Sequence, residues 1–286
     1  MKLDLKIITV LVAIVPLGPP LLADTSGWEM VWADEFEKPG LPDPEKWGYE
    51  EGFVRNHEKQ LYTASRAKNA RVEGGNLVIE GHRERVANPG YEAGSSDWRS
   101  NRASTFYTSA SLHTKGIASW RYGRIEVRAK VPRGAGTWPA IWTLGTDIDE
   151  VGWPRCGEID IMEFVGKEER FIHATAHYWR AGKHDSDSKK HPVPAPWEDF
   201  RVYAIEWDEN QIHFEYDGQR YQTFQIGKAD GDGGNPFRRP HYLILNLALG
   251  GSWGGKIDDA IFPCRYLIDY VRVYRRAAGG AESVEG

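Results

Sequence analysis

Alternation of polar and apolar residues is the dominant pattern in this chain, and it predicts strands almost throughout. Residues 124–131 read Arg-Ile-Glu-Val-Arg-Ala-Lys-Val, as in a strand that buries one face. Residues 267–274 alternate in a similar way. Residues 242–249 are almost entirely apolar around Asn246, which predicts a strand buried on both faces. The pattern indicates no long amphipathic helix.

Short turns rich in glycine separate the predicted strands. Asp217-Gly218 lies between the strand-like segments 212–216 and 221–224, which is a strong hairpin signal. Gly74-Gly75 marks a second turn of this kind. Many short strands joined by such turns predict an all-β fold, a β-sandwich or jelly roll.

Three polar and irregular segments, residues 52–65, 87–106 and 180–197, are predicted to be loops. In a sandwich, such loops tend to lie at the rims and shape a binding cleft. For the last segment, which is rich in Lys and His, a solvated loop without a role is the simpler interpretation.

Residues 1–23 are typical of a secretory signal peptide. Lys2 and Lys6 supply positive charge, residues 7–15 are apolar, and Ala23 is the expected last residue before cleavage. An uncleaved membrane anchor is the alternative, although the apolar run is short and prolines follow it. We therefore expect a secreted or periplasmic protein with no membrane partner after cleavage. The small, polar residues 277–286 are expected to be disordered.

Composition narrows the possible functions. The 286 residues carry a net charge of -5 and show no basic stripe, which argues against a nucleic-acid partner. The 12 Trp, 13 Tyr and 10 Phe fit either a β-rich core or a cleft in which flat rings stack on sugars. Export would permit a disulfide between Cys156 and Cys264, but we favour two free, buried thiols.

Three carboxylates stand within six residues of an otherwise apolar, strand-like segment. Glu158 and Asp160 share one face of a regular strand, because side chains alternate, whereas Glu163 has the opposite parity. One extra residue near Met162, accommodated as a β-bulge, would return Glu163 to the first face. Ile159 and Ile161 would then lie on the opposite face of the strand.

Paired carboxylates of this kind perform glycoside hydrolysis. With the bulge, Glu158 and Glu163 lie roughly 13 Å apart at Cα, and their side chains could approach the separation that suits a retaining double displacement. One must be ionised and the other must hold a proton, which requires a raised pKa. A charged, solvated strand and a Ca²⁺ site are the alternatives.

Residues 158–163 resemble the active-site signature of glycoside hydrolase family 16, and the extra residue before the last acid resembles the laminarinase branch. Four more segments are similar to laminarinase segments, in the expected order: residues 136–142, 152–157, 246–251 and 269–274. The resemblance implies a β-jelly roll with a concave cleft, in which residues 24–276 form the catalytic domain. It also implies a retaining endo-β-1,3-glucanase that needs no catalytic cofactor and acts on a polysaccharide.

Carried over by position, Glu158 would be the nucleophile, Asp160 its helper and Glu163 the acid/base. Residues that match substrate-binding positions are Asn56, Trp138, Trp142, Trp153, His177 and Trp253. The resemblance places Trp138 and Trp142, four residues apart, on one strand face where they stack on glucose rings. It places His177 on the next strand, hydrogen-bonded near the acid/base. Core packing is the alternative for any single tryptophan.

The family often carries a structural Ca²⁺ on its convex side. By position, the ligands would be the backbone carbonyls of Glu35 and Gly75 and the carboxylate of Asp269. Asp269 could equally pair with a surface arginine.

The sequence also departs from the family pattern. Ser111 stands where many relatives have Arg, and Cys264 stands where Gln is common, which leaves the subsites and preferred chain length open. Mixed β-1,3-1,4-glucan, a galactan and transglycosylation are alternatives with the same acids. A sugar-binding lectin is an alternative of another class, but it has no use for three crowded carboxylates. We expect a monomer.

Overall fold

The computed structural model describes residues 27–231 and 233–277. The predicted signal peptide, residues 1–23, and nearly all of the predicted tail lie outside these residues. Among the helices of the described part, none has both the length and the apolar character needed to cross a membrane.

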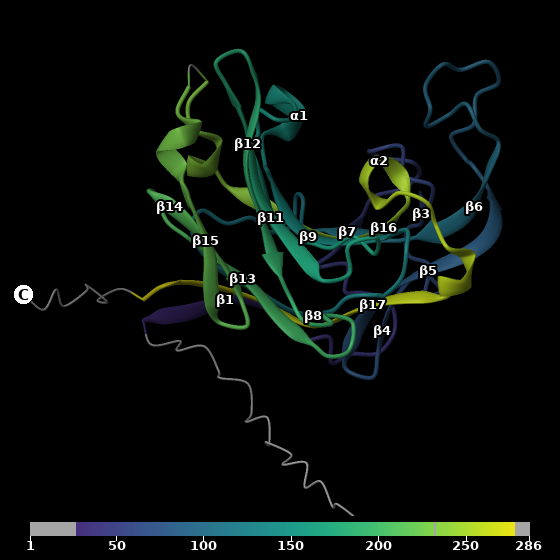
Figure 1. Ribbon diagram of the computed structural model, residues 1–286, viewed down its shortest axis with the longest axis horizontal. Helices are drawn as coiled ribbons and strands as arrows, with labels where there is room; N and C mark the ends of the chain where they lie inside the picture. The colour runs from purple at the N-terminus through teal and green to yellow at the C-terminus, as the bar shows by residue number, and fades with distance from the viewer. Residues whose placement is uncertain (1–26, 232, 278–286) are drawn as a thin grey trace, which may run out of the picture.

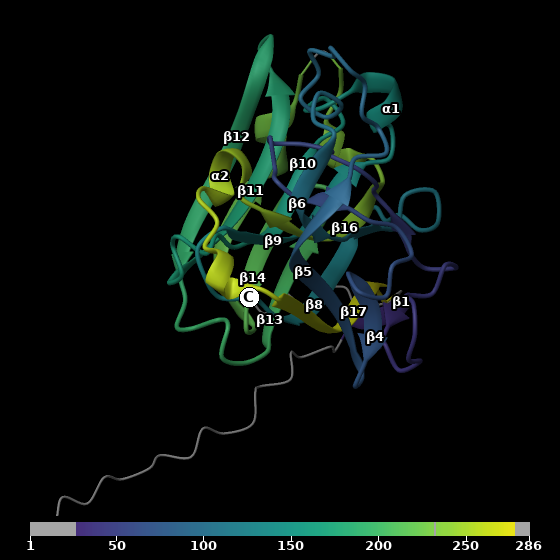
Figure 2. The same ribbon diagram turned by 90° about the vertical axis from the view of Figure 1, so that its right-hand side faces the viewer.

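Two β-sheets pack face to face, which confirms the predicted sandwich (Figures 1 and 2). In the described residues the smaller sheet has the spatial order β12-β11-β10-β9-β16-β7-β2. Its strands are β2 (Gly48–Tyr49), β7 (Ser111–His113), β9 (Thr137–Gly145), β10 (Glu158–Glu163), β11 (Phe171–Arg180), β12 (Lys183–Pro192) and β16 (His241–Leu249).

The larger sheet has the order β15-β14-β13-β8-β17-β5-β6-β3, and β1 and β4 pair with β17 and β5. Its strands are β1 (Trp28–Asp34), β3 (Leu61–Tyr62), β4 (Ala70–Glu73), β5 (Asn76–Ala87), β6 (Ser104–Ser109), β8 (Gly123–Lys130), β13 (Arg201–Trp207), β14 (Gln211–Tyr216), β15 (Gln219–Gln225) and β17 (Cys264–Arg276). Two single-turn helices, α1 (Ile148–Val151) and α2 (Gly251–Gly254), lie on the side of the smaller sheet that faces away from the larger one (Figure 1).

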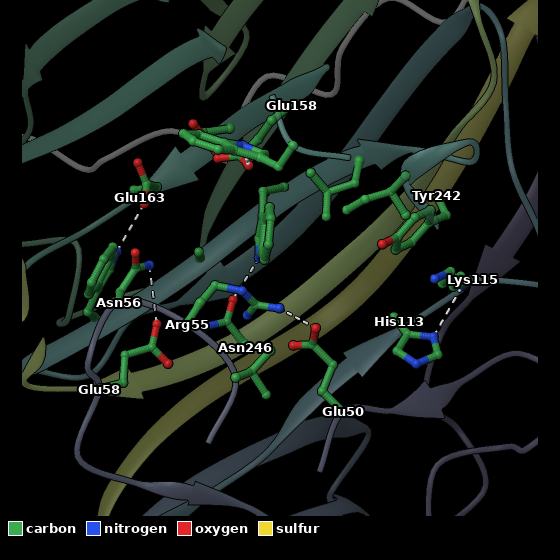
Figure 3. Close-up of a pocket in the computed structure, with 18 of the residues that line it drawn as sticks. Glu50, Arg55, Asn56, Glu58, His113, Lys115, Glu158, Glu163, Tyr242 and Asn246 are labelled. Atoms are coloured by element: carbon green, nitrogen blue, oxygen red, sulfur yellow. Dashed lines mark hydrogen bonds and ion pairs between the residues drawn. The ribbon is translucent and has the colours of Figure 1, made fainter. Parts of the chain in front are cut away.

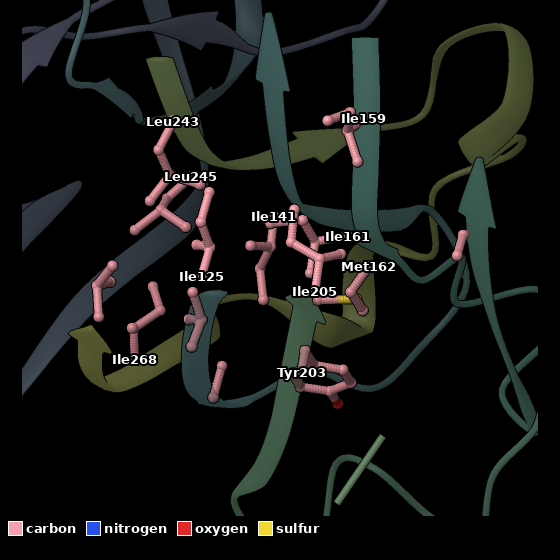
Figure 4. Close-up of a cluster of buried hydrophobic side chains, with 14 of the residues drawn as sticks. Ile125, Ile141, Ile159, Ile161, Met162, Tyr203, Ile205, Leu243, Leu245 and Ile268 are labelled. Atoms are coloured by element: carbon pink, nitrogen blue, oxygen red, sulfur yellow. The ribbon is translucent and has the colours of Figure 1, made fainter. Parts of the chain in front are cut away.

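Aliphatic side chains from both sheets meet in one core between them (Figure 4). The smaller sheet contributes Ile159 and Ile161 from β10 and Leu245 from β16, and the larger sheet contributes Ile125 and Ile268. All of these side chains are almost completely buried, and each such burial stabilises the fold by about 1.5–3 kcal/mol. Strand β16 is buried along its whole length, as its unbroken apolar run predicts.

The predicted turns are confirmed, and the sheet extends beyond the prediction at one edge. The hairpins at Gly74-Gly75 and Asp217-Gly218 join β4 to β5 and β14 to β15. The prediction of a loop over residues 180–197 is wrong, because β12 occupies most of that segment and pairs with β11 over ten residues. Strand β12 is the edge of its sheet and is mostly exposed, so its residues need no apolar alternation.

Both cysteines are buried and free, as predicted. The Cys156 side chain packs with residues of β9 and β16, whereas Cys264 begins β17 in the other sheet.

Candidate active site

A β-bulge in β10 brings the three acids to one face. Asp160 pairs with Thr175 of β11 and Glu163 pairs with His173, so Ile161 and Met162 together oppose a single residue. Both bulge side chains point into the core, where they are 1% and 0% exposed. The predicted bulge near Met162 is therefore confirmed, and the carboxyls of all three acids line one cleft.

This cleft has a volume of about 690 Å³ and lies on the smaller sheet, opposite the hydrophobic core (Figure 3). Glu158 and Glu163 lie toward one end of it, and Tyr242 and Lys115 lie toward the other (Figure 3). Other residues that line the cleft include Glu50, Arg55, Asn56, Glu58, Trp138, Trp142, Trp153 and Asn246.

Glu158 is held by groups from two other segments. The indole of Trp153 donates a hydrogen bond from Nε1 to Glu158 Oε2 at 2.8 Å, and His177 Nε2 lies 3.8 Å from Oε1. Burial, followed by the neighbouring Asp160 carboxyl, raises the pKa of Glu158 to about 8, against the opposing effects of His177 and Trp153. The side chain is 16% exposed, so it can still reach a ligand in the cleft.

Asp160 lies beneath Glu158 and is 2% exposed. Burial raises its pKa to about 7, while a hydrogen bond with Glu158 acts in the opposite direction. His177 Nε2 is 3.2 Å from Asp160 Oδ2, but the two groups are not aligned as a hydrogen bond. His177 was expected near Glu163. It lies instead beside Glu158 and Asp160, because it pairs directly with Glu158 and the bulge sets His173 opposite Glu163.

Glu163 accepts a hydrogen bond at 3.0 Å from Nε1 of Trp138, which stands on the adjacent strand β9. Burial, followed by the nearby Asp160 carboxyl, raises the pKa of Glu163 well above its usual range. Like charges this close cannot all ionise together, so the acids titrate as a coupled group. The site can therefore present one ionised and one protonated carboxyl side by side.

Trp138 and Trp142 lie on the cleft side of β9, as their spacing implies. The indole of Trp142 donates from Nε1 to Asn246 Oδ1 at 2.7 Å, and Asn246 donates in turn to the Tyr62 hydroxyl at 2.9 Å. The Arg55 guanidinium lies 4.7 Å from the Trp142 ring centre. These contacts fix the orientation of the ring, as a stacking surface requires.

The other two predicted cleft residues take different positions. Asn56 lines the cleft, and its side-chain amide donates to Glu58 Oε1 at 3.4 Å. Trp253 in α2 does not line the cleft. Its ring centre lies 5.4 Å from that of Trp138, edge-on, and 4.8 Å from that of His173, so it supports the Trp138 indole.

The sequence pattern did not identify the charged floor of the cleft. Arg55 forms an ion pair with Glu50, and the Ser111 hydroxyl donates to the other Glu50 oxygen at 2.6 Å. Buried Glu58 accepts a hydrogen bond from Gln60 at 2.7 Å. In the sequence, the only indication of this network was the high share of polar residues in segment 52–65. Ser111, which departs from the family pattern, thus takes part in this network.

The expected calcium ligands lie on the larger sheet and at its turns. Asp269 stands at an irregularity of β17, where its Oδ2 accepts a 2.5 Å hydrogen bond from Arg128. The alternative pairing with an arginine is therefore what the structure shows. The other oxygen of Asp269 remains available to a calcium ion. Because Arg128 already neutralises this carboxylate, the residues fit the ion only weakly.

Residues 57–272 match the family model described as glycosyl hydrolases family 16. Among curated proteins, the chain is 42% identical to a beta-glucanase of Rhodothermus marinus, over 94% of this chain and 93% of that protein.

Solved structures with a similar fold and sequence include two from work on glycoside-cleaving enzymes. The laminarinase from Rhodothermus marinus aligns with a TM-score of 0.75 and 43% identity, covering 88% of this chain and 98% of that one. A structure from work on endo-acting O-glycanases of the human gut microbiota, which initiate mucin breakdown, aligns with a TM-score of 0.84 and 38% identity. It covers 90% of this chain and 94% of the other.

Proposed function

Because the chain belongs to glycosyl hydrolases family 16, we propose that it is a retaining endo-β-1,3-glucanase that cleaves laminarin-type glucans. The observation that carries this proposal is the bulge that sets Glu158, Asp160 and Glu163 on one face of a cleft. The similarity to proteins named beta-glucanase and laminarinase supports the linkage.

In the first step, ionised Glu158 attacks the anomeric carbon while Glu163 gives its proton to the departing glycosidic oxygen. The raised pKa of Glu163 keeps that proton available. Formation of the glycosyl ester removes the negative charge of Glu158, so Glu163 ionises more easily afterwards.

In the second step, Glu163 takes a proton from water, and the resulting hydroxide displaces Glu158 at the same carbon. Asp160 shares a hydrogen bond with Glu158 and holds the carboxyl in position between the two steps. Two displacements at one carbon restore the starting configuration, so the product keeps the β-anomer.

The aromatic residues of the cleft suit a sugar chain. Trp142 presents a ring whose orientation is fixed, and Trp153 closes the wall above Glu158. The cleft also extends past the acids toward Tyr242, which leaves room for several sugar units on one side of the cleaved bond (Figure 3). Endo action follows from such a cleft, because an internal bond can enter it.

Glu158→Gln tests the assignment of the nucleophile. The amide cannot form the ester, so we expect kcat on laminarin to fall by at least about 10³-fold. The measurement is reducing-sugar release, with Glu209→Gln, an exposed residue remote from the cleft, as the matched control. Unchanged release by Glu158→Gln would show that another group attacks the anomeric carbon.

One other substrate class has support. The neighbour from the work on endo-acting O-glycanases makes mucin O-glycans a second candidate. Parallel product profiles on laminarin, lichenan, agarose and mucin O-glycans decide between them, and early release of short laminari-oligosaccharides is the expected result. Preferential release from agarose or mucin would overturn the glucan assignment, and binding without release from any of the four would favour the lectin.

Export, a monomeric state and a structural calcium ion are further parts of the proposal. For calcium, one carboxylate and two carbonyls form a ligand set of low charge, so affinity in the millimolar range is expected.

Thermal unfolding with Ca²⁺ and with a chelator tests the ion. Millimolar Ca²⁺ should raise Tm and the chelator should reverse the rise, because binding to the folded state alone stabilises it. Asp269→Asn serves as the matched variant and should show no rise. An equal rise in both proteins would place the ion elsewhere.

A further inference from the structure

One histidine converges with the carboxyls of Glu158 and Asp160, and the proposed hydrolysis gives this histidine no role. The nearest oxygen atoms of Glu158 and Asp160 and a ring nitrogen of His177 all lie within 4.8 Å of one another. His177 Nε2 is 3.2 Å from Asp160 Oδ2 and 3.8 Å from Glu158 Oε1. Ligand atoms at about 2.0–2.2 Å from a tetrahedral Zn²⁺ stand roughly 3.3–3.5 Å apart, so small side-chain shifts would complete that geometry.

The ring nitrogen of His177 that faces away from the carboxyls has its own partner, as is usual for metal-binding histidines. Its Nδ1 lies 2.9 Å from Nε2 of His184 on the edge strand β12, at hydrogen-bond distance. When His177 donates from Nδ1 to His184, its Nε2 carries a lone pair toward the two carboxyls. The His184 ring also packs 4.7 Å from Trp153, which limits its own movement.

Asp160 supplies an independent indication. The residue is 2% exposed, and its Oδ2 has no hydrogen-bond partner within the described part of the chain. A buried carboxylate oxygen normally has a partner, because leaving it without one costs about 1–3 kcal/mol. The oxygen points toward His177 Nε2, so a cation between them would satisfy both atoms.

We propose that Glu158, Asp160 and His177 form a binding site for a divalent ion of the zinc class, which inhibits the enzyme reversibly. A mixed set of imidazole and carboxylate ligands favours Zn²⁺ over Ca²⁺ or Mg²⁺, which prefer oxygen ligands alone. Three protein ligands leave a fourth position for water on the cleft side. The ion occupies the Glu158 carboxylate that would attack the sugar, and this inhibitory effect rests on the proposed function.

Direct binding is the test. The full chain without a polyhistidine tag is titrated with ZnSO₄ by calorimetry, and with Co²⁺ followed by its visible absorption. The expected result is one Zn²⁺ per chain and a Co²⁺ spectrum of tetrahedral intensity. His177→Gln and Asp160→Asn should each weaken Zn²⁺ binding at least tenfold. His184→Phe, which keeps a ring beside Trp153, should weaken it by about 10-fold or more.

His213→Gln removes a half-buried histidine on β14, remote from the cleft, and is the matched control, which should bind Zn²⁺ as the unaltered chain does. Thermal unfolding of each variant shows that it is folded. Equal Zn²⁺ affinity in the unaltered chain, His177→Gln and Asp160→Asn would overturn the site, as would the absence of stoichiometric binding at millimolar Zn²⁺.

Hydrolysis separates this proposal from the proposed function. Zn²⁺ should inhibit laminarin hydrolysis competitively, at the concentrations that saturate the calorimetric site. Zn²⁺ binding that depends on His177, in a chain that cleaves no glycan, would support the metal site and refute the enzymatic assignment.

Discussion

At the scale of the residue, two indoles regulate the two acids that we propose to react. Trp153 donates its N–H to Glu158, and Trp138 donates its N–H to Glu163. Each hydrogen bond favours the ionised carboxyl and lowers its pKa, against burial, which raises it. Spacing alone could place Trp138 on the cleft face. It could not show where the indole nitrogen points, because that depends on the rotamer and on the bulge in the next strand.

Replacing each indole by a phenyl ring should move a different limb of the pH profile of kcat/KM. Trp153→Phe removes a donor to Glu158, raises the pKa of that group and shifts the acidic limb to higher pH. Trp138→Phe acts on Glu163 and shifts the alkaline limb to higher pH. A hydrogen bond to a charged group is worth about 1.5–3 kcal/mol, so shifts of about one to two pH units are expected.

Trp28→Phe on the remote strand β1 is the control for these profiles and should leave both limbs in place. Movement of the same limb by both cleft variants would contradict the separate roles of Glu158 and Glu163.

At the scale of the element, the alternation of side chains along a strand predicted the bulge in β10 but could not predict the strand β12. The sequence of β10 contains its own evidence, since one extra residue stands between acids that must share a face. The polar strand β12 contains no such evidence. It pairs through its backbone at a sheet edge and buries little, so no apolar period reveals it.

Deleting Met162 should preserve part of the activity. The shortened strand would alternate regularly, and its three acids would still share one face. Met162 is 0% exposed, so its loss should lower the free energy of unfolding by about 2–5 kcal/mol. Deleting Ile161 and Met162 together reverses the parity of the last acid and should abolish hydrolysis. Initial rates on laminarin and denaturant unfolding of both variants provide the comparison, and equal residual rates would contradict the role of the bulge.

At the scale of the whole molecule, the larger sheet contains a buried charge cluster that the cleft does not use. Arg124 has a side chain that is 4% exposed, and it donates to Glu126, Glu206 and Glu215 at 2.9, 3.3 and 2.6 Å. These acids come from three adjacent strands, β8, β13 and β14. One guanidinium thus contacts three carboxylates and connects three neighbouring strands of the sheet.

Arg124→Met should lower the free energy of unfolding by about 3–5 kcal/mol, because it removes the arginine partner of buried Glu126 and leaves Glu215 only its 3.8 Å contact with Arg220. Denaturant unfolding measures the loss. Arg133→Met is the matched control, since its ion pair with Glu169 is exposed and should contribute no more than about 1 kcal/mol. A loss no larger than that of the control would mean that solvent already screens the cluster.

The sequence could predict the sheet sandwich and the acid strand, because each depends on periodicity within one segment. It could not predict the floor of the cleft. Asn246 meets Tyr62 across 184 positions of the chain, and Ser111 meets Glu50 across 61. Such contacts depend on how the sheets close on each other, which no local pattern encodes.

Because of the crowded carboxyls on β10, the folded chain binds a proton that the unfolded chain releases near neutral pH. Below the ordinary pKa of a glutamic acid, folded and unfolded chains both keep the Glu158 proton, and this group does not affect stability. As the pH rises toward about 8, the unfolded chain has released that proton while the folded chain still holds it, so stability falls. Unfolding near neutral pH therefore acidifies its surroundings, and the heat measured on unfolding depends on the enthalpy with which the buffer takes up the released protons.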